Sequence, residues 1–267
     1  MDDRVRVEMH GSVADVRLVR ADKMNALDDA MFNALAETGE RLKVQKGLRA
    51  VVLSGEGRAF CAGLDMGNFG KMASGERRGG AGLVDVQRTA GGSNRAQHVV
   101  MVWREMPVPV IAAVHGVAFG GGFQLALGAD IRIVAPDTRL AVLEIKWGLV
   151  PDMAGLVLLR GLVRDDVARE LTYTGRIFSG EEALAMGIAT RVSNDPRGEA
   201  MKLAAEIAGK SPDATRAGKR LFNLVADADQ KTILLHESRE QGALIGSPNQ
   251  TEAVMSNLQR RTASYAD

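Results

Sequence analysis

Residues 115–124 read HGVAFGGGFQ and place three consecutive glycines between a short apolar run, residues 109–114, and the start of a predicted helix. A short, continuous apolar run is typical of a buried strand. Glycines at the beginning of a helix leave its first backbone N–H groups uncovered, and such groups bind anions or developing oxyanions. The segment therefore predicts a strand, a turn and a helix whose N-terminal N–H groups bind an anion or a developing oxyanion. The alternative is that the glycines only allow the helix to pack closely on the strand.

Two other glycine-rich motifs that bind phosphates do not fit this sequence. The dinucleotide fingerprint G-x-G-x-x-G fails, because the sixth position counted from Gly120 is Leu125. The pair Gly70-Lys71 is followed by Met72 rather than Ser or Thr, so it does not form a nucleotide-binding P-loop.

A second glycine-containing bend lies upstream of the first. Residues 54–65 read SGEGRAFCAGLD and follow another short apolar run, residues 50–53. Taken alone, this segment is only a loop after a strand. Together with the glycine turn at 120–122 it suggests two backbone N–H donors that converge on one oxygen atom, which is how an oxyanion hole is built.

The rest of the N-terminal half indicates an α/β protein. Residues 5–19 alternate in polarity, as in a half-buried strand, and residues 28–43 repeat apolar side chains at helical spacing. With the strand at 50–53 this gives a βαβ rhythm. Residues 67–94 are rich in glycine and show little periodicity, so we expect a long surface loop, either a lid or a linker, with one short helix near Leu83.

The C-terminal half continues this pattern and then becomes helical. We expect a helix at 123–128 and short strands at 131–134 and 140–143. Ser179 and Glu182 form a capping box that begins a helix ending near Met186. The remaining predicted helices cover residues 199–209, 212–225, 231–241 and 251–261. Residues 1–195 are therefore predicted as an α/β core, and residues 196–267 as a helical region.

Composition excludes several classes of function. The 267 residues carry a net charge of +1, so no strong positive field favours nucleic acid. The single cysteine, Cys61, excludes an internal disulfide and favours a cytoplasmic protein; we expect it to be a small packed residue. The four histidines are scattered without ligand spacing, so no metal site is expected. We predict neither a secretion signal nor a membrane-spanning segment.

The segments AFCAGLD (59–65) and HGVAFGGGFQLALGADIRI (115–133) together resemble the crotonase superfamily, also called the enoyl-CoA hydratase/isomerase family. The resemblance extends from KMNAL at 23–27 to Arg260-Arg261. It implies a spiral of ββα units with a C-terminal α-helical region that covers the active site and forms homotrimers or homohexamers. It also implies an acyl-CoA thioester substrate, in fatty-acid or related metabolism, with no separate cofactor because coenzyme A is part of the substrate.

The resemblance implies roles for particular residues. The backbone N–H groups of Leu64 and Gly121 match the two oxyanion donors, which stabilise a thioester enolate. Ala62 matches a position whose backbone contacts the adenine of CoA. Lys23 and Arg260 match CoA-binding positions, with Arg260 and Arg261 near the phosphates. For this arginine pair a solvated helix face is an equally good interpretation.

Hydratases of the family carry two glutamates, where this sequence has Gln124 and Glu144. Glutamine has no titratable proton, so Gln124 can orient a water or a substrate group but cannot be the general base. Glu144 lies in the apolar run LAVLEI, and burial there would raise its pKa towards neutrality. A solvent-facing Glu at the end of a strand is the alternative.

Asp152 stands eight residues after Glu144, the spacing that resembles the Glu/Asp pair of dienoyl-CoA isomerases. The alternative for Asp152 is a helix N-cap that follows Pro151. A 3,2-enoyl-CoA isomerase of the family can work with one carboxylate, which Glu144 supplies. We therefore predict double-bond isomerisation first, hydration of a 2-enoyl-CoA second, and third a non-catalytic acyl-CoA-binding subunit.

Overall fold

The computed structural model of the chain describes residues 4–74, 81–84 and 86–267. Its main sheet has six strands in the order β1-β2-β3-β4-β6-β8, and every neighbouring pair is parallel except the β1–β2 hairpin. The strands are β1 (Val5–His10), β2 (Val13–Leu18), β3 (Ala50–Gly55), β4 (Val110–Val114), β6 (Ile131–Val134) and β8 (Arg191–Val192). The α/β class predicted from the sequence is confirmed.

A second sheet supports the glycine turn. It pairs β5 (Val117–Phe119) in parallel with β7 (Arg139–Ala141). The helix α5 (Gly121–Leu127) begins two residues after β5 ends, so the strand–turn–helix unit predicted around the three glycines is present. The predicted strand at 140–143 is the shorter β7.

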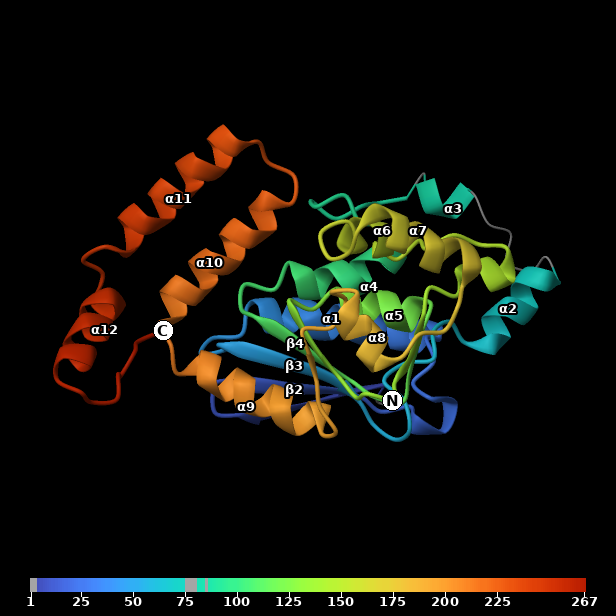
Figure 1. The fold of residues 1–267 in the computed structure, drawn as a ribbon, viewed down its shortest axis with the longest axis horizontal. Helices are drawn as coiled ribbons and strands as arrows, with labels where there is room; N and C mark the ends of the chain where they lie inside the picture. Colours follow the sequence, from blue (N-terminus) through green and yellow to red (C-terminus); the bar gives the residue numbers. More distant parts are fainter. Residues whose placement is uncertain (1–3, 75–80, 85) are drawn as a thin grey trace.

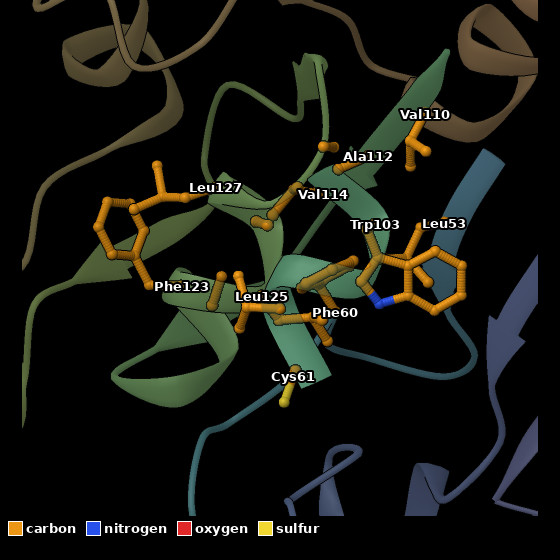
Figure 2. Packing of buried hydrophobic residues seen from close by; sticks show 14 of the residues in the cluster. Leu53, Phe60, Cys61, Trp103, Val110, Ala112, Val114, Phe123, Leu125 and Leu127 are labelled. Atoms are coloured by element: carbon orange, nitrogen blue, oxygen red, sulfur yellow. The ribbon is translucent and has the colours of Figure 1, made fainter. Parts of the chain in front are cut away.

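Both faces of the main sheet are covered, which explains why its central strands are apolar throughout. On one face Leu53, Val110 and Ala112 pack against Trp103 and Phe60 (Figure 2). The helices α1 (Asp29–Lys43), α4 (Arg95–Arg104) and α5 lie on this side (Figure 1). On the other face, alanines of α9 (Pro196–Ala208) pack against alternate residues of the same strands, among them Val13, Val52, Ile111 and Ile133.

The prediction of an irregular loop for residues 67–94 is wrong for residues 67–73, which are helical. Helix α2 (Met66–Ala73) begins directly after Asp65, whose side chain accepts a hydrogen bond of 2.8 Å from the Gly67 N–H. The short helix expected near Leu83 is confirmed as α3 (Ala81–Val84). The part of that prediction that falls on residues 75–80 and 85 lies outside the described residues.

Helix α4, which follows this region, was not predicted from the sequence. Asn94 caps it and exchanges hydrogen bonds with Gln97, 3.0 Å from the Gln97 N–H to Asn94 and 2.9 Å from the Asn94 N–H to Gln97. This reciprocal capping box was readable in the sequence as Asn followed by Gln three residues later.

Helices make up most of the C-terminal part, and the capping box at Ser179 and Glu182 is confirmed. The helices are α6 (Gly155–Leu159), α7 (Asp165–Thr174), α8 (Gly180–Ala185), α10 (Pro212–Val225), α11 (Gln230–Leu244) and α12 (Pro248–Leu258). Figure 1 shows α10, α11 and α12 extending away from the sheet, whereas α9 lies along it. The division at residues 195/196 therefore falls before a helix that belongs to the packing of the sheet; the two-domain assignment itself stays a prediction.

None of the helices in the described residues is both long and apolar enough to cross a bilayer.

Candidate active site

The glycine turn directs one backbone N–H out of the N-terminus of α5. Gly120 has φ +50° and ψ −117°, a conformation that L side chains rarely adopt. Its carbonyl accepts a hydrogen bond of 2.9 Å from the Gln124 N–H, so the next N–H, that of Gly121, points the opposite way along the helix axis. As the first residue of α5, Gly121 has no acceptor for this N–H within the helix.

The second bend runs beside this turn. Cys61 pairs in parallel with Ala118, which aligns residues 61–64 with the end of β5. Gly63 has φ +88°, and a Cβ built on it would lie 2.5 Å from the Phe119 carbonyl oxygen and 3.6 Å from the Gly121 nitrogen. Only glycine fits this close approach, which brings the peptide between Gly63 and Leu64 next to the Gly121 amide.

Leu27 sets the orientation of that peptide. Its N–H donates to the Gly63 carbonyl over 2.8 Å, and its carbonyl accepts from the Asp65 N–H over 3.0 Å. Since a trans peptide holds its C=O and N–H on opposite sides, the Leu64 N–H points away from Leu27, towards β5 and α5. The tertiary structure thus brings together the two N–H groups that the resemblance singled out.

The carboxyl group of Glu144 lies against the same turn. Glu144 begins a short 3₁₀ helix, η2 (Glu144–Trp147), and a Cβ built on Gly120 would lie 3.2 Å from Glu144 Oε1. Gln124 Nε2 donates a hydrogen bond of 2.7 Å to the same oxygen. The other oxygen, Oε2, is buried and has no hydrogen-bond partner among the described residues.

Burial raises the pKa of Glu144 above the usual range of a glutamic acid, because it penalises the charged form. The negative charge of Asp152 raises this pKa further, while the hydrogen bond from Gln124 opposes the rise. A raised pKa makes the carboxylate a stronger base, which suits a group that takes a proton from carbon. The alternative of a solvent-facing Glu at a strand end does not hold.

Both the nitrogen and the oxygen of the Gln124 side-chain amide form hydrogen bonds within the protein. The side chain is 1% exposed, and its Oε1 accepts hydrogen bonds from the Met153 and Gly155 N–H groups, both 2.9 Å. These two donors fix the amide oxygen, so the Nε2 end must face Glu144. Gln124 therefore ties the 153–155 turn to Glu144, which leaves its oxygen unable to orient a water.

Asp152 sits on this turn and is exposed. Its negative charge raises the pKa of Glu144, and the role of the two carboxyl groups as a pair stays a prediction. The alternative interpretation of Asp152 as a helix N-cap is wrong, because the N-cap residue of α6 is Ala154, in the left-handed conformation.

Two of the three predicted CoA-binding residues lie together. The Ala62 N–H donates a hydrogen bond of 2.9 Å to the Met24 carbonyl, and Lys23 ends the adjacent 3₁₀ helix η1 (Ala21–Lys23) with its side chain exposed. Arg260 follows α12, at the left of Figure 1, whereas α2, which directly follows Asp65, lies at the right. Within one chain the structure does not bring Arg260 to the other site residues.

Asn25 is a site residue that the sequence analysis did not single out. It is fully buried with φ +56°, and its Nδ2 donates to the carbonyls of Glu56 and Ala59, 3.0 and 2.8 Å away. It thereby anchors residues 23–27 to residues 54–60. Asparagine is among the few residues enriched in the left-handed region, and this is the signal that the sequence offered.

Cys61 is a packed residue, as predicted. Its side chain is fully buried, and its thiol donates to the Asn25 carbonyl over 3.1 Å. Burial raises the pKa of the thiol to about 12, so it carries no thiolate at neutral pH.

One group of metal-type ligands occurs in the described part of the chain, Glu8, His10 and Asp15 on β1 and β2. Arg17 is ion-paired with Glu8, and Arg197 with Asp15. Two arginines therefore already neutralise the two carboxylates, and we do not propose a metal site at this group.

The chain is similar to known proteins in both sequence and structure. The sequence model of the family described as enoyl-CoA hydratase/isomerase matches residues 8–267. Carnitinyl-CoA dehydratase of Proteus mirabilis is 33% identical over 85% of this chain and 83% of its own. Mitochondrial methylglutaconyl-CoA hydratase of Mus musculus is 28% identical over 99% and 84% of the two chains. The crystal structure of an enoyl-CoA hydratase from Bacillus anthracis superposes with a TM-score of 0.88, 27% identity and 98% coverage of both chains.

Proposed function

We propose a reaction for this protein from one premise, that the chain belongs to the enoyl-CoA hydratase/isomerase family. Its fold is the crotonase fold, with a C-terminal helical region, and it is an acyl-CoA enzyme of that family. We propose that it isomerises the double bond of an enoyl-CoA or dienoyl-CoA through a thioester enolate.

In this proposal the thioester oxygen lies between the N–H groups of Leu64 and Gly121. Negative charge develops on that oxygen when a proton leaves the neighbouring carbon, and each donor is worth about 2.7–4 kcal/mol in the transition state. Because both donors are backbone groups on glycine bends, they are already oriented before the substrate arrives. The positive end of the α5 dipole favours the same charge.

Glu144 is the proposed proton carrier. The observation that supports a single carrier is its asymmetric carboxyl group: Gln124 holds Oε1 at 2.7 Å, and Oε2 is buried beside the turn without a partner. Oε2 would take a proton from C2 of a 3-enoyl-CoA and return one to C4, giving the 2-enoyl-CoA. No water is consumed, so one carboxyl group suffices for the whole reaction.

Hydration of a 2-enoyl-CoA is the second candidate. The names of the relatives favour it, since they include a carnitinyl-CoA dehydratase and a methylglutaconyl-CoA hydratase. Glu144 would then activate the water, and Asp152 is the neighbouring carboxylate that acts on the pKa of Glu144. Gln124 would contribute only through Glu144, because two backbone donors occupy its oxygen.

A single-turnover experiment in heavy water separates these reactions. The purified protein is offered a 2-enoyl-CoA, a 3-enoyl-CoA and a 3,5-dienoyl-CoA in turn, and mass and ultraviolet absorbance are followed together. We expect the 3-enoyl or dienoyl ester to shift its double bond without gaining the mass of water. Gain of one water on the 2-enoyl ester would instead establish hydration. Tight binding without turnover of any ester would support a non-catalytic acyl-CoA-binding subunit.

Replacing Asp152 by Asn is expected to move the acidic limb of the kcat/KM profile to lower pH. The negative charge of Asp152 raises the pKa of Glu144, so its removal lowers that pKa. Ionised Glu144 is the form that takes the proton, and it would then persist at lower pH. Rate measurements across the acidic limb check this, with the exposed Asp137→Asn as a control that leaves the limb in place. An unmoved limb in Asp152→Asn would remove Asp152 from the site.

We further propose that the protein works as a homotrimer or homohexamer without a separate cofactor, because proton transfer and carbonyl polarisation need only the groups described. The helices α10, α11 and α12 expose apolar side chains, and a second copy would cover them. The most exposed of these are Phe222 (74%) in α10 and Leu258 (75%) in α12, and Ile245 (66%) directly follows α11. Arg260 could then reach CoA bound to a second copy. The cytoplasmic location stays a prediction.

A further inference from the structure

The orientation of the Leu64 amide depends on a single crossing of two chain segments. Residues 26–28 cross residues 63–65, and Leu27 alone makes the two backbone hydrogen bonds described above, to Gly63 and Asp65. Before the crossing, the Ala62 N–H also donates to the Met24 carbonyl over 2.9 Å, so the segments are held together on that side. After the crossing, on the side of Asp28 and Asp65, the orientation of the Leu64 amide depends on a further contact.

Arg20 supplies that contact. Its Nη1 donates to Asp65 Oδ2 over 2.6 Å and to the Ala26 carbonyl over 3.1 Å, and its Nη2 lies 3.5 Å from Asp28 Oδ2. Ala26 and Asp28 flank Leu27 on one segment, and Asp65 follows Leu64 on the other. One planar guanidinium group therefore fastens both segments one residue away from their crossing.

Asp65 has both of its carboxylate oxygens engaged. Oδ2 accepts from Arg20, and Oδ1 accepts from the Gly67 N–H over 2.8 Å at the start of α2. The side chains of Arg20 and Asp65 are only 14% and 21% exposed, so their charge-assisted hydrogen bonds are partly shielded from water. The Gly67 N–H and then Arg20 lower the pKa of Asp65, which keeps the carboxylate ionised at neutral pH.

A neighbouring ion pair, between Arg4 and Asp28, involves the segment of Leu27 but not Asp65. Arg4 Nη2 lies 2.8 Å from Asp28 Oδ2, with side chains 19% and 23% exposed. This pair resembles the Arg20–Asp65 pair in charge and burial. It reaches the segment of Leu27 at Asp28, where Arg20 also lies, so its removal is a control for the loss of an ion pair at this segment.

We propose that the Arg20–Asp65 ion pair is a positioning element of the reaction, which holds the Leu64 amide in register with the Gly121 amide. The inference rests on the proposed function, because it concerns the same oxyanion hole. Neither side chain needs to touch the substrate. Loss of the pair lets the crossing pivot, so that the Leu64 N–H no longer aims at the thioester oxygen.

The kinetic expectation is a loss in kcat with little change in substrate binding. Removing one oxyanion donor outright costs about 10²–10³ in kcat, so a misdirected donor is expected to cost about 10- to 100-fold. We expect this loss in Arg20→Met and in Asp65→Asn, with the Kd for the CoA ester within about threefold of the wild type. Arg4→Met should leave kcat within about twofold, although it removes a comparable ion pair.

The two positions should behave as one unit. The double variant Arg20→Met/Asp65→Asn is expected to lose no more kcat than the worse single variant, because either change already breaks the pair. Arg20→Lys keeps one charge contact with Asp65 but lacks the fork that also reaches Ala26, so its kcat should be intermediate. Losses that multiply in the double variant would show two independent effects and contradict the pair.

A spectroscopic measurement separates positioning from general destabilisation. Butyryl-CoA labelled with carbon-13 at the carbonyl is bound to each variant, and the carbonyl stretch is recorded by isotope-edited infrared difference spectroscopy. Oxyanion donors weaken the C=O bond and lower its frequency. We expect the lowered frequency in the wild type and in Arg4→Met, and a return towards the solution value in Arg20→Met and Asp65→Asn.

Two negative results have different meanings. If the wild type binds butyryl-CoA without lowering the carbonyl frequency, the oxyanion hole and the proposed function fall, and this proposal falls with them. If the wild type lowers the frequency and both pair variants keep it lowered, the positioning role alone is overturned. Asp65→Asn is nearly isosteric, so it carries the test if Arg20→Met does not fold.

Discussion

Replacing Glu144 by Gln is expected to lower turnover by about 10²- to 10⁴-fold, the range that a positioned general acid–base group contributes. The glutamine can still accept the hydrogen bond that Gln124 Nε2 now donates to Oε1 over 2.7 Å, so the local geometry should persist. It cannot take a proton from carbon. Binding of a saturated acyl-CoA, measured by calorimetry, should stay within about threefold of the wild type.

The same variant has an expected signature in stability. Because burial raises the pKa of Glu144 in the folded protein, its contribution to stability is fully present below the unfolded pKa and is lost as pH rises through the folded pKa. A neutral glutamine has no such loss. Thermal unfolding should therefore show Glu144→Gln gaining stability relative to the wild type as pH rises, with the difference smallest in acid.

The control for Glu144→Gln is Glu105→Gln. Glu105 is also a partly buried carboxylate, paired with Lys43 at 2.9 Å, and it belongs to no part of the proposed site. Its replacement should leave turnover within about twofold. Unchanged turnover in Glu144→Gln would contradict the assignment of Glu144 as proton carrier. Asp152 would then be the next candidate for that role.

Replacing Gly121 by Pro is expected to lower kcat by about 10²–10³-fold, because it removes one of the two proposed oxyanion donors. Gly121 is the first residue of α5, where the helix itself does not use the N–H and where proline is well tolerated. The variant therefore deletes the N–H group that the proposal places at the thioester oxygen. Steady-state kinetics on the ester that the wild type turns over gives the measurement.

Gly121→Ala is the matched variant, because it adds side-chain bulk but keeps the N–H. A Cβ at this position would lie 2.8 Å from Met153 Sδ and 3.0 Å from Leu27 Cδ1, both at the ends of flexible side chains. The alanine variant should lose clearly less kcat than the proline variant. Equal losses in the two would mean that crowding, and not the missing donor, explains the effect.

Features that depend on neighbours in the chain were readable in the sequence. The apolar runs predicted the parallel strands, and the glycines at 120–122 predicted a strand–turn–helix unit with a free N–H at its start. The run around Glu144 predicted a buried carboxyl with a raised pKa; Glu144 is partly buried, and this burial raises its pKa. These features follow from local periodicity, backbone conformation and hydrophobicity, so each can be predicted from one short segment of the sequence.

Other features depend on contacts between segments that are distant in the chain. The sequence left the role of Gln124 open, and only the approach of the 153–155 turn, about thirty residues later, commits its oxygen to the protein. The pairing of Leu27 with Leu64 and the bridging by Arg20 also join distant segments. No pattern within either segment contains this information.

By itself, then, the sequence determined the α/β class, the two glycine bends and the buried glutamate, because each is encoded within a few consecutive residues. The tertiary structure decided that the bends lie side by side, that Gln124 holds one oxygen of Glu144 and that Asp152 is not a helix cap. It also placed α12, which Arg260 follows, at the opposite end of the molecule from α2. The physical reason is that hydrogen bonds across segments form only when the sheet and helices pack, and packing is a property of the whole chain.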